Sequence, residues 1–237
     1  MRKEPLSGYV VHSRPYRETS RIVHFFSLEH GRVDGVCRGK VPTSYQLFQV
    51  FASGNQSLKT FTGFEEQTAA HILQADALIA GFYLNELLLR LLPVEEAMPQ
   101  LWLSYQYTVG ELSRLPAKGA LANLKSLLRL FEYVLITELG YGLDFRTDHQ
   151  GAPIEIKCTY AFDPDEGFQR ANHGFLGQTI LRAAELLTAG QSGLPMSEHW
   201  QDPAIQQFLS RVFRLQIHRL LDGQPIRSRA LWLTRSQ

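Results

Sequence analysis

Short apolar segments separated by turn residues occupy the N-terminal third of this 237-residue chain. They are rich in Val, Ile, Phe, Tyr and Thr, and Gly, Ser, Asn or Pro stands between them, which is typical of β-strands. The segments are GYVVHS, RIVHFFSLE, RVDGVCRG, QLFQVFAS, SLKTFT and TAAHIL, with SLEHGR as a hairpin turn between the second and third. Five or six short strands in about seventy residues predict a small closed β-barrel.

The spacing of apolar positions becomes helical near residue 76. Residues 76–93 carry a wide apolar stripe, with Asp76 as a candidate N-cap and Pro93 as a stop. Further helices are predicted at residues 100–115, 121–142, 178–190 and 202–223. The last has Asp202 as N-cap and Pro203 in its first turn. Residues 145–176 show no clear period and are predicted to be irregular.

These patterns predict an α+β protein with two domains. A β-barrel domain takes residues 1–75, and a helical domain with an irregular insert at 145–176 takes residues 76–237. The only cysteines, Cys37 and Cys158, are too few for a disulfide framework, so a cytoplasmic location is expected. No signal peptide is evident. Polar residues interrupt the longest apolar stretch, so no membrane span is expected.

Basic residues gather at the two ends of the chain, although the formal net charge is only +1. Residues 1–40 contain eight Arg and Lys against four acids, and from Ile205 onward there are six arginines and one acid, Asp222. Acids gather in the middle, at Glu65, Glu66, Asp76, Glu86, Glu95 and Glu96. This distribution is compatible with a basic face for an anionic partner and also with ordinary solvated charge.

The segment GRVDGVCRGK, residues 31–40, ends like a phosphate-binding loop. Such a loop needs four residues between its glycines and a hydroxyl after the lysine. Here three residues separate Gly35 from Gly39, and Val41 follows Lys40. We therefore interpret Arg38 and Lys40 as contacts for backbone phosphates of a nucleic acid.

The N-terminal strands closely resemble the RecO family of bacterial recombination mediators. The family motif runs through one strand into a second and then to G-R-v and k-G. Its matches here are His12-Ser13-Arg14-Pro15-Tyr16, Glu18-Thr19-Ser20, Gly31-Arg32-Val33 and Gly39-Lys40. Further matches are YLNELLLRLL (83–92), LRLFEYVLITELGYGLDF (128–145) and GQPIRSRALW (223–232), so the resemblance touches both predicted domains.

The resemblance implies an OB-fold domain followed by a helical domain. It also implies a protein that binds single- and double-stranded DNA, anneals complementary strands and helps to load recombinase onto DNA coated with single-stranded DNA-binding protein. RecR is the implied partner, the implied location is the nucleoid, and no cofactor is implied. Many members carry a four-cysteine zinc site after the GYG segment. This chain has only Cys158 there, with His149 and His173 nearby, so no metal is expected.

Candidate DNA contacts fall into two groups. The first is on the barrel and comprises Arg14, Arg17, Arg21, Arg32, Arg38 and Lys40. The second is C-terminal and comprises Arg211, Arg214, Arg227 and Arg229, with His218 on the same predicted helix face as Arg211 and Arg214. Tyr16 and Tyr45 could stack on bases or pack in the barrel.

By the resemblance, the helical domain binds the acidic C-terminal tail of single-stranded DNA-binding protein, which ends in an apolar residue with a free carboxylate. Such a tail needs a cation beside an apolar pocket. The candidates are Lys125, Arg129, Leu128, Phe131, Leu101 and Trp102. The alternative for Arg129 is an ion pair with Glu132 or Glu86.

No motif of a known enzyme class is present: the sequence lacks G-x-S-x-G, H-E-x-x-H and paired carboxylates. The expectation is therefore a non-enzymatic DNA-binding mediator. An RNA-binding OB-fold protein is the alternative, and a hydrolase with no recognisable motif is a third possibility. Competition between DNA and RNA separates the first two, and annealing without nucleotide separates the first from the third.

Overall fold

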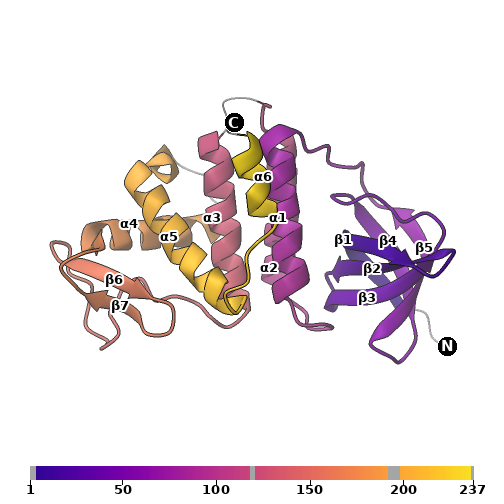
Figure 1. Cartoon of the computed structure of the whole chain (residues 1–237), viewed down its shortest axis with the longest axis horizontal. Coiled ribbons are helices and arrows are strands. Elements are labelled where there is room, and N and C mark those ends of the chain that lie inside the picture. The colour runs from indigo at the N-terminus through magenta and orange to yellow at the C-terminus, as the bar shows by residue number, and fades with distance from the viewer. Residues whose placement is uncertain (1–3, 118–120, 192–197, 236–237) are drawn as a thin grey trace. The chain divides into compact units, whose positions relative to one another are not determined.

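A computed structural model describes residues 4–117, 121–191 and 198–235. The chain forms two compact units, one comprising Met1–Ala117 with Ile226–Gln237 and the other Lys118–Pro225. A strand-rich N-terminal part followed by helices confirms the predicted α+β class (Figure 1). The first two helices share the first unit with the barrel. The boundary between residues 75 and 76 stays a prediction.

The first unit contains a closed five-stranded barrel with the strand order β1-β2-β3-β5-β4. The strands are β1 (Glu4–Tyr16), β2 (Ser20–Ser27), β3 (Gly31–Arg38), β4 (Leu47–Ser53) and β5 (Leu58–Glu66). The pairs are antiparallel except β3 with β5, and β4 closes the barrel by pairing with β1. The predicted hairpin turn between β2 and β3 is confirmed, and Gly31 ends it with φ +63°.

Alternate side chains of these strands fill the barrel interior, which includes Val23, Phe25 and Phe61. Gly35 lies within β3, and a Cβ atom there would lie 2.6 Å from the Phe61 ring. A larger residue would therefore displace that ring. Because the strand runs straight through Gly35, residues 31–40 do not form a phosphate-binding loop.

The sixth predicted strand, residues 68–73, is wrong. These residues are irregular and connect β5 to the first helix, and the Ile72 side chain is 73% exposed. Hydrogen bonds tie the segment to the barrel side of the unit: the His71 N–H donates to the Tyr45 carbonyl at 3.0 Å, and the Gln46 side chain donates to the Thr68 carbonyl at 2.8 Å. An apolar pattern without a free strand edge beside it does not form a strand.

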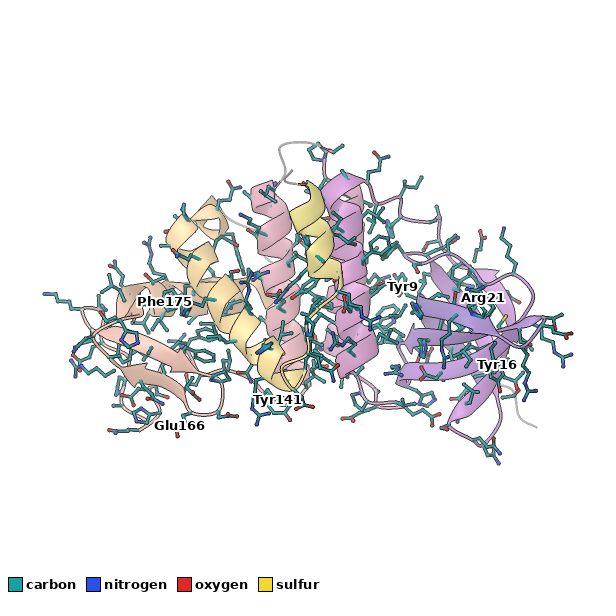
Figure 2. The ribbon with its side chains drawn as sticks, in the orientation of Figure 1. Tyr9, Tyr16, Arg21, Tyr141, Glu166 and Phe175 are labelled. Atoms are coloured by element: carbon teal, nitrogen blue, oxygen red, sulfur yellow. The ribbon has the colours of Figure 1, made fainter. Side chains whose placement is uncertain are left out.

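Helices α1 (Ala75–Leu91) and α2 (Pro99–Arg114) pack against the outer face of β1 and β2. Aromatic rings make this contact, and Figure 2 labels one of them, Tyr9 of β1. The Tyr9 ring centroid lies 5.1 Å from that of Tyr105 and 6.0 Å from that of Trp102. The buried Asn85 amide links three elements, because it donates to the Val11 carbonyl at 3.0 Å and accepts from the Tyr105 hydroxyl at 2.7 Å. The N-cap of α1 is Gln74, and Asp76 lies in the first turn instead of at the predicted cap.

A short C-terminal helix, α6 (Ser228–Arg235), was not predicted and belongs to the first unit. Its N-terminus is held by Glu86 of α1, whose carboxylate accepts the N–H groups of Arg227 and Ser228 at 2.8 Å. Burial alone would raise the pKa of Glu86, but these hydrogen bonds lower it. The carboxylate thus stays charged where the positive end of the helix dipole favours it.

The second unit combines helices with a small sheet. The helices are α3 (Leu121–Glu138), α4 (Gly177–Gln191), the 3-10 turn η1 (Glu198–Gln201) and α5 (Pro203–Leu220). The predicted irregular insert is wrong, because it contains β6 (Thr159–Asp163) and β7 (Gly167–Arg170), which Figure 1 labels, and β8 (Phe175–Leu176). Their order in the sheet is β7-β6-β8. Phe145, Phe168 and Phe208 join sheet and helices in one aromatic core.

Asp202 is the N-cap of α5 as predicted, since its side chain accepts the Ala204 N–H at 2.8 Å. Every helix within residues 4–117, 121–191 and 198–235 is too short or too polar to span a bilayer.

Candidate nucleic-acid interface

Side chains from β1, β2 and β3 form cross-strand rows on the outer face of the barrel. Tyr16 pairs with Ser20, and Ser20 pairs with Arg38, so an aromatic ring and a cation lie two strands apart in one row. Arg14 lies on the same face, two residues before Tyr16. Helices α1 and α2 cover the other end of this face, where Tyr9 and Phe26 are buried. The uncovered end therefore presents polar and basic groups.

Four of the six basic residues predicted on the barrel have exposed side chains: Arg14, Arg17, Arg38 and Lys40. Arg17 lies in the turn between β1 and β2, and Lys40 follows the end of β3. The Gly39 N–H donates to the Thr19 carbonyl at 3.2 Å, which joins these two segments. We refer to Arg14, Arg17, Arg38, Lys40 and Tyr16 as the barrel face.

Tyr16 is half-buried, and the Arg17 guanidinium lies 5.1 Å from its ring centroid. One side of the ring therefore has a cation-π contact. His12 lies on the same outer face, with its ring 5.8 Å from that of His24. Partial desolvation, with the nearby His24, Arg14 and Arg21, lowers the pKa of His12. His12 belongs to the family motif matched in the sequence, and it alternates with Arg14 and Tyr16 on one strand.

Arg32 is engaged inside the first unit. Its guanidinium donates to the Asp34 carboxylate at 2.7 and 3.1 Å and to the Leu89 carbonyl of α1 at 2.7 Å. The Arg32 side chain is only 19% exposed. The remaining Asp34 contact comes from His24 at 2.7 Å. Arg32 thus connects the barrel to the C-terminal end of α1, where a cation is favoured.

We expect the variant Asp34→Asn to lower the free energy of unfolding by about 2 kcal/mol at neutral pH. Burial alone would raise the pKa of Asp34, but hydrogen bonds from His24 and Arg32 lower it from 3.8 to about 2. Each pKa unit corresponds to about 1.4 kcal/mol. A carboxyl group whose pKa is lowered in the folded state stabilises the fold at pH values above its pKa in the unfolded state. The difference between variant and parent should therefore shrink as pH falls from about 4 toward 2.

Urea unfolding followed across this pH series measures the effect. Glu66→Gln is the matched control, since Glu66 is an exposed carboxylate on β5 of the same barrel. A constant difference between Asp34→Asn and the parent at all pH values would contradict the ionic role of Asp34.

Two other predicted barrel residues are partly or fully withdrawn from solvent. Arg21 is half-buried and donates to the Ser13 hydroxyl at 3.3 Å, which leaves part of its guanidinium accessible. Tyr45 is 7% exposed and packs against Gly81 of α1, where a Cβ atom would lie 2.8 Å from the Tyr45 ring. Of the two open interpretations for Tyr45, the structure therefore favours packing.

The second predicted basic group is divided between the two units. Arg211, Arg214 and His218 are exposed on α5 in the second unit, at the spacing predicted for one helix face. Arg227 and Arg229 belong to the first unit. Arg227 is exposed, but Arg229 donates to the Tyr83 hydroxyl at 3.1 Å and lies 5.4 Å from the Tyr83 ring centroid.

The residues predicted to bind a partner tail also fall in different units. Leu101 and Trp102 are buried in the first unit, where Trp102 contacts Tyr9. In the second unit, Leu128 and Phe131 are buried and Lys125 is exposed. Arg129 is 11% exposed and donates to the fully buried Glu132 at 3.0 Å, one of the alternatives considered from sequence. The tail pocket stays a prediction.

The residues considered for zinc are apart or otherwise engaged. The Cys158 thiol lies beside the Arg170 guanidinium and 3.3 Å from the Glu155 carboxylate, and His149 and His173 are exposed. Within the described ranges, no three His, Cys, Asp or Glu side chains are grouped as a metal ion would require. The absence of a metal remains a prediction for elemental analysis.

The barrel topology and the helices that follow it define the class: an OB-type barrel protein with a helical C-terminal region. The family profile described as "Recombination protein O N terminal" matches residues 1–77, and "Recombination protein O C terminal" matches residues 73–229. The chain belongs to the RecO family. The resemblance seen in the sequence is thereby confirmed.

Curated relatives cover almost the whole chain. The protein named "DNA repair protein RecO" from Pseudomonas paraeruginosa is 34% identical over 235 residues, which are 97% of this chain and 94% of the relative. Proteins of the same name from Stutzerimonas stutzeri and Marinobacter nauticus are 36% and 35% identical, covering 95% and 98% of this chain and 92% and 94% of the relatives. Membership in this family supports a function in DNA repair and recombination.

Proposed function

We propose that the chain is a recombination mediator that binds single-stranded DNA on the barrel face and anneals complementary strands. The observation that carries this proposal is the group of four exposed cations around Tyr16 at the uncovered end of β1–β3. Cations that neutralise phosphates bind DNA without regard to sequence, and an aromatic ring adds base stacking. Neither action requires a nucleotide or a catalytic group.

Annealing also needs a place for a second strand or a duplex. The exposed cations Arg211 and Arg214 on α5, and Arg227 near the C-terminus, are candidates for this role. We assign these three arginines to contacts with a duplex or a second strand. We do not describe them as one surface, because they belong to two different compact units. Arg32 and Arg229 contribute through the fold, since their guanidinium groups are engaged with Asp34 and Tyr83.

We extend the proposal to partners through the family. In recombinational repair the chain would help to load recombinase onto DNA coated with single-stranded DNA-binding protein, together with RecR, at the nucleoid. The acidic tail of the coating protein would bind in the second unit near Lys125, which is exposed on α3. A charge-assisted contact to the tail carboxylate fits this side chain.

The test is annealing of two complementary strands that are both coated with single-stranded DNA-binding protein, in the absence of nucleotide. We expect the full chain to accelerate duplex formation, and RNA of the same sequence to compete less well than DNA. No acceleration with coated or naked strands would overturn the proposal. Stronger competition by RNA would instead favour the RNA-binding alternative.

A further inference from the structure

A cavity of about 290 Å³ lies in the second unit, and none of the residues assigned above to DNA or the partner tail lines it. Three segments form it: the loop after α3 with Tyr141 and Asp144, the turn between β6 and β7 with Glu166, and α5 with Gln216. Figure 2 shows Tyr141 and Glu166 along the same edge of this unit.

The cavity is strongly acidic. Four of its lining residues are carboxylates, namely Asp144, Asp148, Asp165 and Glu166, and none of the lining residues is Lys, Arg or His. Backbone N–H groups fix two of these carboxylates: Arg146 donates to Asp144 at 2.7 Å, and Gln150 and Ala152 donate to Asp148 at 2.9 Å. Asp165 is already paired with Arg219 at 2.8 Å. The local field therefore attracts a cation and repels phosphate.

A buried acceptor in the same cavity points to a ligand with donors. Gln216 lines the cavity and is 3% exposed, and its Oε1 atom has no hydrogen-bond partner among the residues that the structure describes. Leaving a buried carbonyl oxygen without a donor is unfavourable, and such groups in native proteins call for an explanation. A ligand N–H would supply the missing bond.

We propose that this cavity binds the guanidinium group of an arginine side chain presented by a partner protein. Guanidinium carries five N–H donors in a plane, which matches several acceptors around one small space better than an ammonium does. The exposed ring of Tyr141 offers a face for stacking. The volume is near the lower end of small-molecule sites, which suits one side chain.

A metal ion and DNA are less suited to this site. No cluster of metal ligands occurs within the described ranges, and the carboxylates here already accept hydrogen bonds from the chain. DNA would bring further negative charge to four acids. The inference does not rest on the proposed DNA function, because it uses none of the barrel-face residues.

Titration of the full chain with an acetylated, amidated Gly-Arg-Gly peptide tests the proposal, with binding followed by calorimetry or NMR. The same peptide with citrulline in place of arginine keeps the shape but removes the charge. We expect saturable binding of the arginine peptide, at least tenfold tighter than the citrulline peptide. The double variant Asp148→Asn, Glu166→Gln should weaken arginine binding about tenfold, since each change removes a charge and keeps an oxygen acceptor.

Glu185→Gln is the matched control, because Glu185 is an exposed acid on α4 of the same unit and does not line the cavity. Unchanged arginine binding in this control, and unchanged DNA binding in the double variant, would support a site separate from the DNA face. Equal binding of the citrulline and arginine peptides would overturn the proposal. Saturation by spermidine without binding of the arginine peptide would also overturn it, since the site would then hold a small free cation.

Discussion

Replacing Arg14, Arg38 and Lys40 together by alanine is expected to weaken binding of single-stranded DNA by about a hundredfold. All three side chains are exposed on the barrel face, and none makes an ion pair among the described residues. If each cation neutralises one phosphate and contributes about 1 kcal/mol, the loss is about 3 kcal/mol, or roughly two powers of ten. For single-stranded DNA each phosphate contact contributes about 0.7 to the magnitude of the slope of log K against log salt. Losing three contacts should therefore reduce that magnitude by about 2.

Fluorescence anisotropy with a labelled oligonucleotide, repeated over a range of salt concentrations, measures both quantities. The matched control is Arg146→Ala, Lys157→Ala, Arg182→Ala, which removes three exposed positive charges from the second unit. We expect the control to change affinity and slope much less. If both triple variants lose affinity equally, net charge governs binding and the barrel face is not the DNA site.

Much of the barrel could be predicted, because alternation along a strand is a local property. Residues 8–66 show it clearly, and the strands there form as predicted. The insert at 145–176 could not be predicted from its period. Its strands β6, β7 and β8 have five, four and two residues, too few for alternation to be seen. The structure there depends on Phe168 packing against Phe145 and Phe208 from elsewhere in the chain.

The sequence shows which basic residues could form the candidate site, but it does not show which of them are engaged by other groups of the fold. Arg32 and Arg38 lie on the same strand and look alike in sequence, yet Arg32 binds the Leu89 carbonyl 57 residues away and Arg38 is exposed. Likewise α6 begins where Glu86, 141 residues earlier, accepts the Arg227 N–H. Such long-range partners decide whether a basic residue serves the fold or remains available to DNA, and no local pattern contains them.

Arg129 of α3 presents the same choice, and its replacement by alanine is expected to lower the free energy of unfolding by about 3 kcal/mol. Its guanidinium lies 3.0 Å from the fully buried Glu132 carboxylate. Removing a cation from beside a buried anion costs about 3–5 kcal/mol, because the ion pair is lost where the remaining charge is poorly solvated. Lys125 is exposed and lies one turn earlier on α3, so its replacement by alanine should lower the free energy of unfolding by less than about 0.5 kcal/mol.

Binding of an acidic tail peptide should show the opposite order. We expect Lys125→Ala to weaken the peptide about tenfold, equivalent to about 1.4 kcal/mol for an exposed charge-assisted contact. Arg129→Lys keeps a cation beside Glu132, so it should retain most of the stability and bind the peptide nearly as the parent does. Urea unfolding and calorimetry with the peptide, on the same four proteins, separate the two roles. If Arg129→Ala unfolds like the parent but no longer binds the peptide, then the Glu132 pair is dispensable and Arg129 itself holds the tail carboxylate.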